Sequence, residues 1–300
     1  GSLITHISLL QNLPKMAWFA EISLMGDLVG VKHGSGVSIN DDFIFEGTFE
    51  GELSSDGILD SCVCLGSGLI ISPVNTIFIT PSHTLEGLFF IKNRSQRFVT
   101  NSNVLAYHLA KITPSHLAIK KSWRIKYGLG QVPQVIEKTN KAEILKISYF
   151  NFQINGDKVV LLEKRKEPDV SNFDEYYQHL LEIGKRLLDN LQMLNGKNWK
   201  LMGTVSTGFD SVACLAIAKK LGCDSAVTLK NGRGDVDDNG IEIAKSIGIQ
   251  CVEYVRPFSE LSSQSRISMN YTLMEKCSEF VAAGTLAEDV CYLPFEQSIS

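Results

Sequence analysis

The stretch Leu201–Gly222 constrains the chain most, because it joins a short apolar segment, a polar turn and an amphipathic segment without interruption. Leu201–Val205 has the length and the boundaries of a buried strand. Apolar residues then recur at helical spacing from Val212 onward, and Gly222 is placed to end the helix. The start of a helix offers unpaired backbone N–H groups and the positive end of the helix dipole. The sequence therefore predicts an anion-binding site at the turn.

The side chains of the turn suit a phosphate and a magnesium ion. The turn consists of Ser206, Thr207, Gly208, Phe209, Asp210 and Ser211. Its three hydroxyl groups can donate to phosphate oxygens, and its glycine lets the backbone come close. A carboxylate beside a phosphate needs a bridging cation, and Mg²⁺ prefers one or two carboxylates together with phosphate oxygens. We therefore expect Asp210 to bind Mg²⁺ within a loop that binds phosphate.

The turn resembles the SGGxDS pyrophosphate loop of the PP-loop ATP pyrophosphatases. Ser206, Gly208, Asp210 and Ser211 match that pattern, and Thr207 stands in place of the first glycine. The resemblance implies that the loop binds the β and γ phosphates of ATP, with Asp210 and Ser211 closest to the reaction. An ordinary strand-to-helix turn with serine and aspartate caps is the alternative interpretation.

Strand and helix patterns continue to alternate after this helix. Ser225–Leu229 is a second short apolar segment, residues 240–247 have helical spacing, and Cys251–Val255 is a third strand candidate. Such alternation predicts a doubly wound, mainly parallel sheet. Ligands of these sheets bind beyond the carboxyl ends of the strands. We therefore expect the Lys230–Asp238 loop and the Arg256-Pro257 turn to lie at the same edge as the Ser206–Ser211 loop.

The same resemblance assigns further residues to the nucleotide. In the related enzymes the end of the second strand helps to hold the adenine and ribose, which implies this role for Leu229 and Lys230. An acidic pair follows there, and Asp237-Asp238 occupies that place here. Capping of the next helix explains the pair equally well. Lys230 and Arg233 are weaker candidates for pairing with phosphate charge, because solvation at the surface explains both.

Residues 1–165 carry strand patterns separated by turn signals, one of which is Ser54–Gly57. The expected strands are Ala17–Leu24, Asp42–Phe49, Cys62–Ile71, Thr76–Ile79, Leu85–Ile91, Arg97–Val99, Ile144–Gln153 and Lys158–Glu163. The Asn155-Gly156 dipeptide predicts a hairpin between the last two strands. A helix is expected over Asn103–Ile112. The sequence therefore predicts a β-rich first domain.

One part of this domain is similar to a segment of asparagine synthetases. The strand Gly87–Ile91, the strand Arg97–Ser102 and the helix from Asn103 correspond to a strand, hairpin and helix of their N-terminal Ntn-type glutaminase domain. The resemblance implies an α+β Ntn-like fold. Those glutaminases use an N-terminal cysteine as nucleophile, whereas the first cysteine here is Cys62. We therefore expect a glutaminase-like domain that lacks the nucleophile; an unrelated β domain is the alternative.

A charged segment around Pro168 separates the two expected domains. A long helix follows, with a capping box at Ser171 and Asp174 and an end at Asn195-Gly196. The predicted domains are therefore 1–165, Ntn-like, and 172–300, a PP-loop nucleotide-binding domain. The latter lacks the next phosphate-contacting loop of the related enzymes, so we expect a fold that is incomplete at Ser300.

Composition narrows the classes of partner. Among 300 residues, 44% are hydrophobic and 21% are charged, and the formal net charge of −4 gives no electrostatic case for nucleic-acid binding. The seven cysteines form neither a disulfide framework nor a zinc set, which favours buried free thiols in a reducing compartment. No apolar run approaches the roughly 18 residues of a membrane span, and we expect a cytoplasmic protein.

The resemblances together imply an ATP- and Mg²⁺-dependent enzyme that forms amides and releases AMP and pyrophosphate. Its partners would be a small-molecule or peptide carboxylate and an amine donor, and a homodimer is compatible with this function. Two alternatives stay open. One is an enzyme that modifies a nucleobase and resembles 7-cyano-7-deazaguanine synthase, and the other is a non-catalytic nucleotide-binding scaffold.

Overall fold

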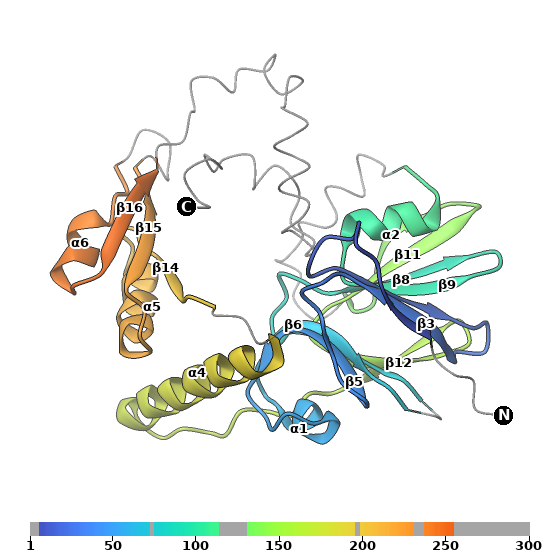
Figure 1. Ribbon diagram of the computed structural model, residues 1–300, viewed down its shortest axis with the longest axis horizontal. Coiled ribbons are helices and arrows are strands. Elements are labelled where there is room, and N and C mark those ends of the chain that lie inside the picture. Colours follow the sequence, from blue (N-terminus) through green and yellow to red (C-terminus); the bar gives the residue numbers. More distant parts are fainter. Residues whose placement is uncertain (1–5, 73–74, 114–130, 196–198, 231–236, 255–300) are drawn as a thin grey trace, which may run out of the picture. The chain divides into compact units, whose positions relative to one another are not determined.

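The computed structural model describes residues 6–72, 75–113, 131–195, 199–230 and 237–254 (Figure 1). The fold is mixed α/β, with two mostly antiparallel sheets and one small parallel sheet. The described residues divide into two compact units. The β-sandwich unit contains the residues up to Asp169 and those from Arg186 to the end of helix α4. The parallel-sheet unit contains Val170–Lys185 and the described residues from Trp199 onward.

Sheet A of the β-sandwich unit has seven strands in the order β1-β3-β2-β9-β8-β11-β10. They are β1 (His6–Leu9), β2 (Trp18–Ile22), β3 (Leu28–His33), β8 (Leu88–Asn93), β9 (Arg97–Thr100), β10 (Gln134–Lys138) and β11 (Ala142–Ile147). Neighbours are antiparallel except β1 and β3. The predicted β8–β9 hairpin is confirmed, with Lys92 paired to Arg97.

Sheet B has six antiparallel strands in the order β13-β12-β7-β6-β5-β4. They are β4 (Ser38–Ile39), β5 (Phe43–Phe49), β6 (Cys64–Ile70), β7 (Ile77–Ile79), β12 (Asn151–Asn155) and β13 (Lys158–Leu162). The predicted hairpin is confirmed: Asn155 pairs with Lys158, and Gly156 has the positive φ of 59° that its turn requires.

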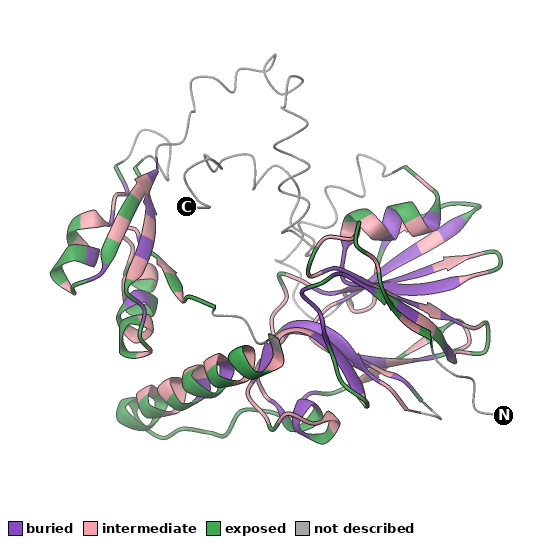
Figure 2. Cartoon of the chain, viewed as in Figure 1, coloured by how far each residue is buried: buried purple, intermediate pink, exposed green. Residues whose placement is uncertain are grey.

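The two sheets share one apolar core, which Figure 2 shows as the buried parts of their strands. Sheet A contributes Trp18, Val31, Phe90 and Val99, and sheet B contributes Ile44, Leu69, Phe78 and Phe152. The Trp18 indole also donates to the Ser67 hydroxyl at 3.2 Å, which satisfies its N–H inside the core. The sheets are therefore the two inner layers of a sandwich.

Helices cover the outer faces of both sheets. Helix α2 (Asn103–Ala110) packs on sheet A, where Ala106 and Tyr107 meet the apolar side chains of β8 and β9. Helix α1 (Ser55–Asp60) and the end of α4 (Phe173–Asn195) pack on sheet B through Ile58 and Leu194. The sandwich has four layers as a result. The central strands β5, β8 and β9 have buried residues on both faces, which explains their apolar runs.

Two sequence predictions for this unit are wrong. The single strand expected over Ile144–Gln153 is two strands, β11 and β12, which belong to different sheets. The chain crosses between the sheets at residues 148–150, where Tyr149 has a φ of 70°. The polar segment Ser54–Gly57, expected as a turn, opens helix α1, because the Ser54 hydroxyl accepts from the Gly57 N–H and caps the first turn.

The parallel-sheet unit holds sheet C, in the order β14-β15-β16. Its strands are β14 (Met202–Thr204), β15 (Ser225–Leu229) and β16 (Gln250–Tyr254), and the helices between them are α5 (Phe209–Lys220) and α6 (Ile241–Ser246). Both strand pairs are parallel. The predicted β–α alternation and mainly parallel sheet are therefore confirmed for the described residues.

The helices α5 and α6, which connect the strands of sheet C, end in the same way. Gly222 and Gly248 have φ values of 94° and 71°, and the residue after each glycine donates to a carbonyl in the last turn of its helix. These are Schellman motifs, in which glycine adopts the left-handed conformation without a steric penalty. The prediction that Gly222 ends the helix is confirmed.

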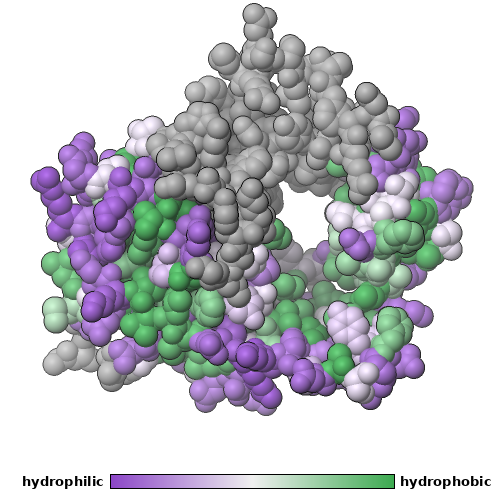
Figure 3. Space-filling model, turned by 180° about the vertical axis from the view of Figure 1, so that it is seen from behind, coloured by the Kyte–Doolittle hydropathy of each residue, from purple (hydrophilic) through white to green (hydrophobic). Residues whose placement is uncertain are grey.

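One face of sheet C packs against α5 and α6. Val205 and Ala226 share a core with Leu215 of α5 and Ala244 of α6. A Cβ at Gly203 would lie 2.3 Å from the Leu215 side chain, so the glycine lets α5 approach β14 closely. On the other face, Met202 and Val252 are exposed among the described residues. Figure 3 shows the whole chain from behind, and hydrophobic and hydrophilic residues alternate on the described part of that surface.

Candidate functional site

The Ser206–Ser211 loop lies at the carboxyl end of β14, as the sequence predicts. The Val205 N–H still pairs with Val227 in the sheet, at 3.0 Å, and α5 begins at Phe209. Gly208 is the N-cap residue and has extended backbone angles, but it has no side chain to cap the helix. The loop therefore leads directly from a parallel strand into a helix of 12 residues.

The Ser211 hydroxyl forms its hydrogen bonds within the loop. It accepts from the Ser206 N–H at 3.0 Å, lies 2.9 Å from the Ser206 hydroxyl and donates to the Gly208 carbonyl at 3.0 Å. The Ser206 hydroxyl in turn accepts from the Gly208 N–H at 3.2 Å. Both serines that were expected to contact phosphate therefore bond to the loop itself in this structure.

Thr207 bonds to a carboxylate from the next β–α connection. Its hydroxyl donates to Asp238 Oδ1 at 2.6 Å, and its N–H donates to the same oxygen at 3.1 Å. Asp238 is buried, and its N–H donates to the Lys230 carbonyl at 3.2 Å. The first loop of sheet C is thereby tied to the segment that follows β15.

The remaining donors of the loop are at the start of α5. The N–H groups of Phe209, Asp210 and Ser211 belong to the first turn, where a helix offers no intrahelical acceptor. The Asp210 carboxylate is exposed there, and the Phe209 side chain is 93% exposed. This end of α5 can therefore take an anion on three N–H groups, with a carboxylate beside it for a cation.

The predicted nucleotide residues at the end of β15 lie at the same edge of sheet C. Leu229 is half-buried, and Lys230 is exposed. The Lys230 N–H donates to the Tyr254 carbonyl at 2.8 Å, which ties it to the end of β16. Arg233 and the Arg256-Pro257 turn lie outside the described residues.

The acidic pair separates into two different roles. Asp237 accepts from the Asn239 N–H at 3.0 Å and so shapes a turn, while Asp238 bonds to Thr207. The Asn239 side chain accepts from the Ile241 N–H at 2.8 Å, while Gly240, the N-cap residue of α6, has no side chain to cap the helix. Capping of α6 by Asp237 or Asp238 is therefore not observed.

Gly240 and Thr228 are two site residues that the sequence analysis missed. The buried Thr228 hydroxyl accepts from the Gly240 N–H at 2.9 Å. A Cβ at Gly240 would lie 2.7 and 2.9 Å from the Val205 methyl groups, so only glycine fits beside the end of β14. The signal in the sequence is a glycine directly after a polar loop and before a helix.

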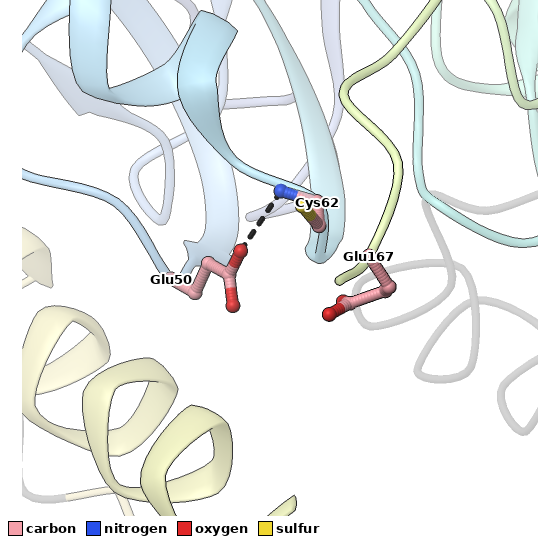
Figure 4. Close-up of side chains that lie close together, drawn as sticks. All are labelled: Glu50, Cys62 and Glu167. Atoms are coloured by element: carbon pink, nitrogen blue, oxygen red, sulfur yellow. Dashed lines mark hydrogen bonds between the residues drawn. The ribbon is translucent and has the colours of Figure 1, made fainter. Parts of the chain in front are cut away.

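A second cluster of side chains, which carry atoms that can bind a metal ion, lies in the β-sandwich unit (Figure 4). Ligand atoms of Glu50, Cys62 and Glu167 lie within 4.8 Å of one another. Glu50 accepts from the Cys62 N–H at 2.8 Å, and the thiol donates to the Lys166 carbonyl at 3.3 Å. Burial, followed by the nearby carboxylates of Glu167 and Glu50, raises the pKa of the Cys62 thiol to about 11. The thiol is therefore a neutral hydrogen-bond donor near pH 7.

The other described cysteines differ in exposure. Cys64 and Cys223 are buried, Cys251 is half-buried, and Cys214 is exposed on α5. The expectation of buried thiols is confirmed for the first two and is wrong for Cys214. Cys277 and Cys291 lie outside the described residues.

Comparisons with known proteins leave the family open. No protein-family model matches the chain, and no curated protein matches it. Within the described part of the chain, no helix has both the length and the apolar character needed to cross a membrane. The residues of the site therefore carry the evidence for function.

Proposed function

We propose that the chain is an ATP-dependent, AMP-forming amide ligase that resembles asparagine synthetase and has no glutaminase activity of its own. The observation that carries the proposal is the start of α5. The Ser206–Ser211 loop opens this helix at the carboxyl edge of a parallel sheet, with an exposed Asp210 in the first turn. An anion site and a cation ligand are thus adjacent, as Mg²⁺-bound ATP requires.

Each residue of the site has a role in this proposal. The first-turn N–H groups of α5 bind the β and γ phosphates, and Asp210 binds Mg²⁺. Ser211, which holds the loop, keeps these donors in place. Leu229 and Lys230 lie at the same sheet edge and contact the nucleoside part of ATP. The site then acts by positioning and by stabilising the charge of the leaving group.

The reaction takes place in two steps. A carboxylate oxygen of the substrate attacks the α phosphorus of ATP, a P–O bond forms, and the bond between the α phosphorus and the bridging oxygen breaks. Pyrophosphate leaves with that electron pair, and a Mg²⁺ ion held by Asp210 would stabilise its charge. An amine then attacks the acyl carbon of the adenylate, AMP leaves, and the amine loses a proton to form the amide.

The four-layered sandwich supports the glutaminase-like part of the proposal. Two antiparallel sheets stack face to face with helices on their outer faces. The β8–β9 hairpin leads into α2, which is the segment that resembles asparagine synthetases. In this proposal the β-sandwich unit is an Ntn-like scaffold, and the amine reaches the parallel-sheet unit from solution.

One observation favours the non-catalytic scaffold as a second candidate. The N–H groups of Ser206, Thr207 and Gly208 and the hydroxyls of both serines already have partners within the protein. A phosphate would have to bind at the α5 N-terminus or replace these bonds. A scaffold needs no phosphate aligned for a reaction, so its loop can keep these bonds.

The deciding experiment is an ATP turnover assay on the full chain with Mg²⁺, in which the products are separated. The acceptor panel contains amino acids and a carboxylated nucleobase, with ammonium as the amine. AMP and pyrophosphate from the wild type, lost in Asp210→Ala but retained in Asp224→Ala at the opposite sheet edge, would support the ligase. ADP and phosphate would overturn it. ATP binding without turnover would favour the scaffold, and turnover with the nucleobase alone would favour the nucleobase-modifying alternative.

A further inference from the structure

Lys146 is a buried lysine with an incomplete set of hydrogen bonds. It follows Ile144 by two residues on β11, so it shares the outer face of sheet A, and it is 6% exposed. Its Nζ donates to one acceptor among the described residues, the Leu85 carbonyl at 3.3 Å. Leu85 is exposed, so Nζ lies beside a surface loop. An ammonium has three donors, and leaving donors unpaired inside a protein costs free energy. A ligand that accepts hydrogen bonds here would remove that cost.

Two further polar atoms at the same end of sheet A lack a partner. They are His83 Nδ1 and Asn103 Oδ1, which are buried and have no hydrogen-bond partner among the described residues. Phe89 pairs with Thr100 on one side and with Lys146 on the other, so these three residues form one row across the sheet. Asn103 opens α2 just after Thr100, and His83 lies in the loop that leads into β8. Buried polar groups nearly always have partners, so three such groups at one end of a sheet point to a ligand.

Glu86 limits the charge that such a ligand can carry. It belongs to the same loop, and its Oε2 lies 3.9 Å from His83 Nε2. Burial lowers the pKa of Lys146, and the carboxylate of Glu86 raises it, because the two charges interact. A monoanion is attracted by the ammonium, whose charge is poorly screened by water. A dianion would be repelled more strongly by Glu86. The charges therefore favour a carboxylate over a phosphate.

We propose that this end of sheet A, with Lys146, His83 and Asn103, binds a small carboxylate. The carboxylate accepts hydrogen bonds from the Lys146 ammonium and forms an ion pair with it. His83 donates from Nδ1 in the tautomer that carries its proton there. Asn103 donates when its amide turns by half a rotation, which puts the nitrogen in the place of Oδ1. The site belongs to the β-sandwich unit and does not depend on the proposed ligase activity.

The measurement is the rate at which each lysine of the full chain is reductively methylated, read by peptide mass spectrometry, with propionate as the probe. At ten times the Kd only about one-eleventh of the sites are free, so methylation of Lys146 should slow about tenfold. Propionate up to about 50 mM reaches this condition for a Kd of a few millimolar. The exposed Lys141 and Lys158 are internal controls and should keep their rates. Because the label is read at Lys146 itself, a carboxylate bound in the parallel-sheet unit does not produce this result.

Substitution tests the ammonium directly. Lys146→Met keeps a long unbranched side chain and removes the charge, and Lys141→Met, just before the other end of β11, is the matched control. Titration calorimetry with propionate should give the wild-type Kd for Lys141→Met and a Kd at least about tenfold higher for Lys146→Met. Asn103→Asp adds a negative charge at the site and should also raise the Kd about tenfold.

Three results would overturn the proposal. An unchanged methylation rate of Lys146 in propionate would exclude a carboxylate at this position. Equal slowing by sodium phosphate, or by sodium chloride at the same ionic strength, would show a general effect of anions and not a carboxylate site. An unchanged Kd of propionate in Lys146→Met would place the binding elsewhere. The first two results come from the wild type, so they decide the question even where Lys146→Met does not fold.

Discussion

Ser67 donates both its N–H and its hydroxyl to one carboxylate oxygen of Glu46, at 3.1 and 2.9 Å, and so binds β6 to β5 through side chains as well as through the sheet. Burial between the sheets raises the pKa of Glu46 to about 8, against the lowering effect of the Ser67 bonds, and nearby Glu86 raises it further. The carboxyl is therefore protonated in the folded protein at neutral pH.

This protonation predicts a pH-dependent stability of the β-sandwich unit. The raised pKa means that the folded state holds a proton that the unfolded state loses above about pH 4.5. The contribution of Glu46 to the free energy of unfolding is therefore fully present below about pH 4.5. It declines as the pH rises to about 8, by at most roughly 1.4 kcal/mol per pH unit. Glu46→Gln should flatten this slope in urea unfolding followed by tryptophan fluorescence. Glu52→Gln, at an exposed site, is the control; equal slopes in both variants would contradict the prediction.

Gly66 predicts a second effect on stability. It has a φ of 142°, and an added Cβ would lie 1.9 Å from the Glu46 carbonyl oxygen. Gly66→Ala should therefore destabilise the unit by about 3 kcal/mol or more, since backbone would have to move. Gly156→Ala is the matched control, because its φ is 59° but its nearest neighbour is 3.8 Å away. That variant should lose only about 1 kcal/mol in the same unfolding assay. A similar loss in both would show that sheet B tolerates the added methyl group.

Asn190 on α4 predicts a third effect. Its Nδ2 donates to the carbonyls of Phe49, the last residue of β5, and Gly51, at 2.6 and 2.7 Å. Asn190→Ala leaves both carbonyls without this donor, and we expect a loss of about 1–3 kcal/mol in the free energy of unfolding. Gln192→Ala, at an exposed position of the same helix, should change it by less than about 0.5 kcal/mol. Equal losses in the two variants would contradict a specific role of these bonds.

The Cys62 thiol predicts a difference in chemical reactivity. With a pKa of about 11, its thiolate fraction at pH 8 is roughly a hundredfold below that of an ordinary thiol. Cys62 should therefore react with iodoacetamide far more slowly than the exposed Cys214, as peptide mass spectrometry can measure. Glu50→Gln removes one of the charges that raise this pKa and should speed the labelling of Cys62 alone. Labelling of Cys62 as fast as Cys214 in the wild type would contradict the assignment.

Local patterns predicted the parts of the fold that local interactions determine. The limits of β15 are those expected from Ser225–Leu229, and Gly222 and the Asn155-Gly156 turn have the positive φ values that their motifs require. Long-range pairing escaped prediction. Nothing in the sequence near residue 149 shows that the chain leaves one sheet for the other there, because no glycine or proline interrupts residues 144–153.

The candidate site shows the same division. The position of the Ser206–Ser211 loop follows from its neighbouring strand and helix, so it was predicted correctly. The hydrogen-bond partners of the loop's donors were not predicted. Asp238 is 31 residues from Thr207 in the sequence and lies beside it only because β14 and β15 pair in sheet C. The Ser211 hydroxyl bonds within the loop because of the backbone geometry there, which residue types alone do not specify.

The strand pairing of sheet C, at whose carboxyl edge the candidate site lies, also bears on the order of folding. Each strand of sheet C pairs with the strand one helix away along the chain, while in sheet A residue Phe19 pairs with Thr100. Closing a short loop costs less entropy than closing a long one, and chains with local contacts fold faster. We therefore expect the strand pairs of sheet C to form before the β2–β9 pair of sheet A, so that the strands next to the proposed nucleotide site are in place before the sandwich acquires its full register.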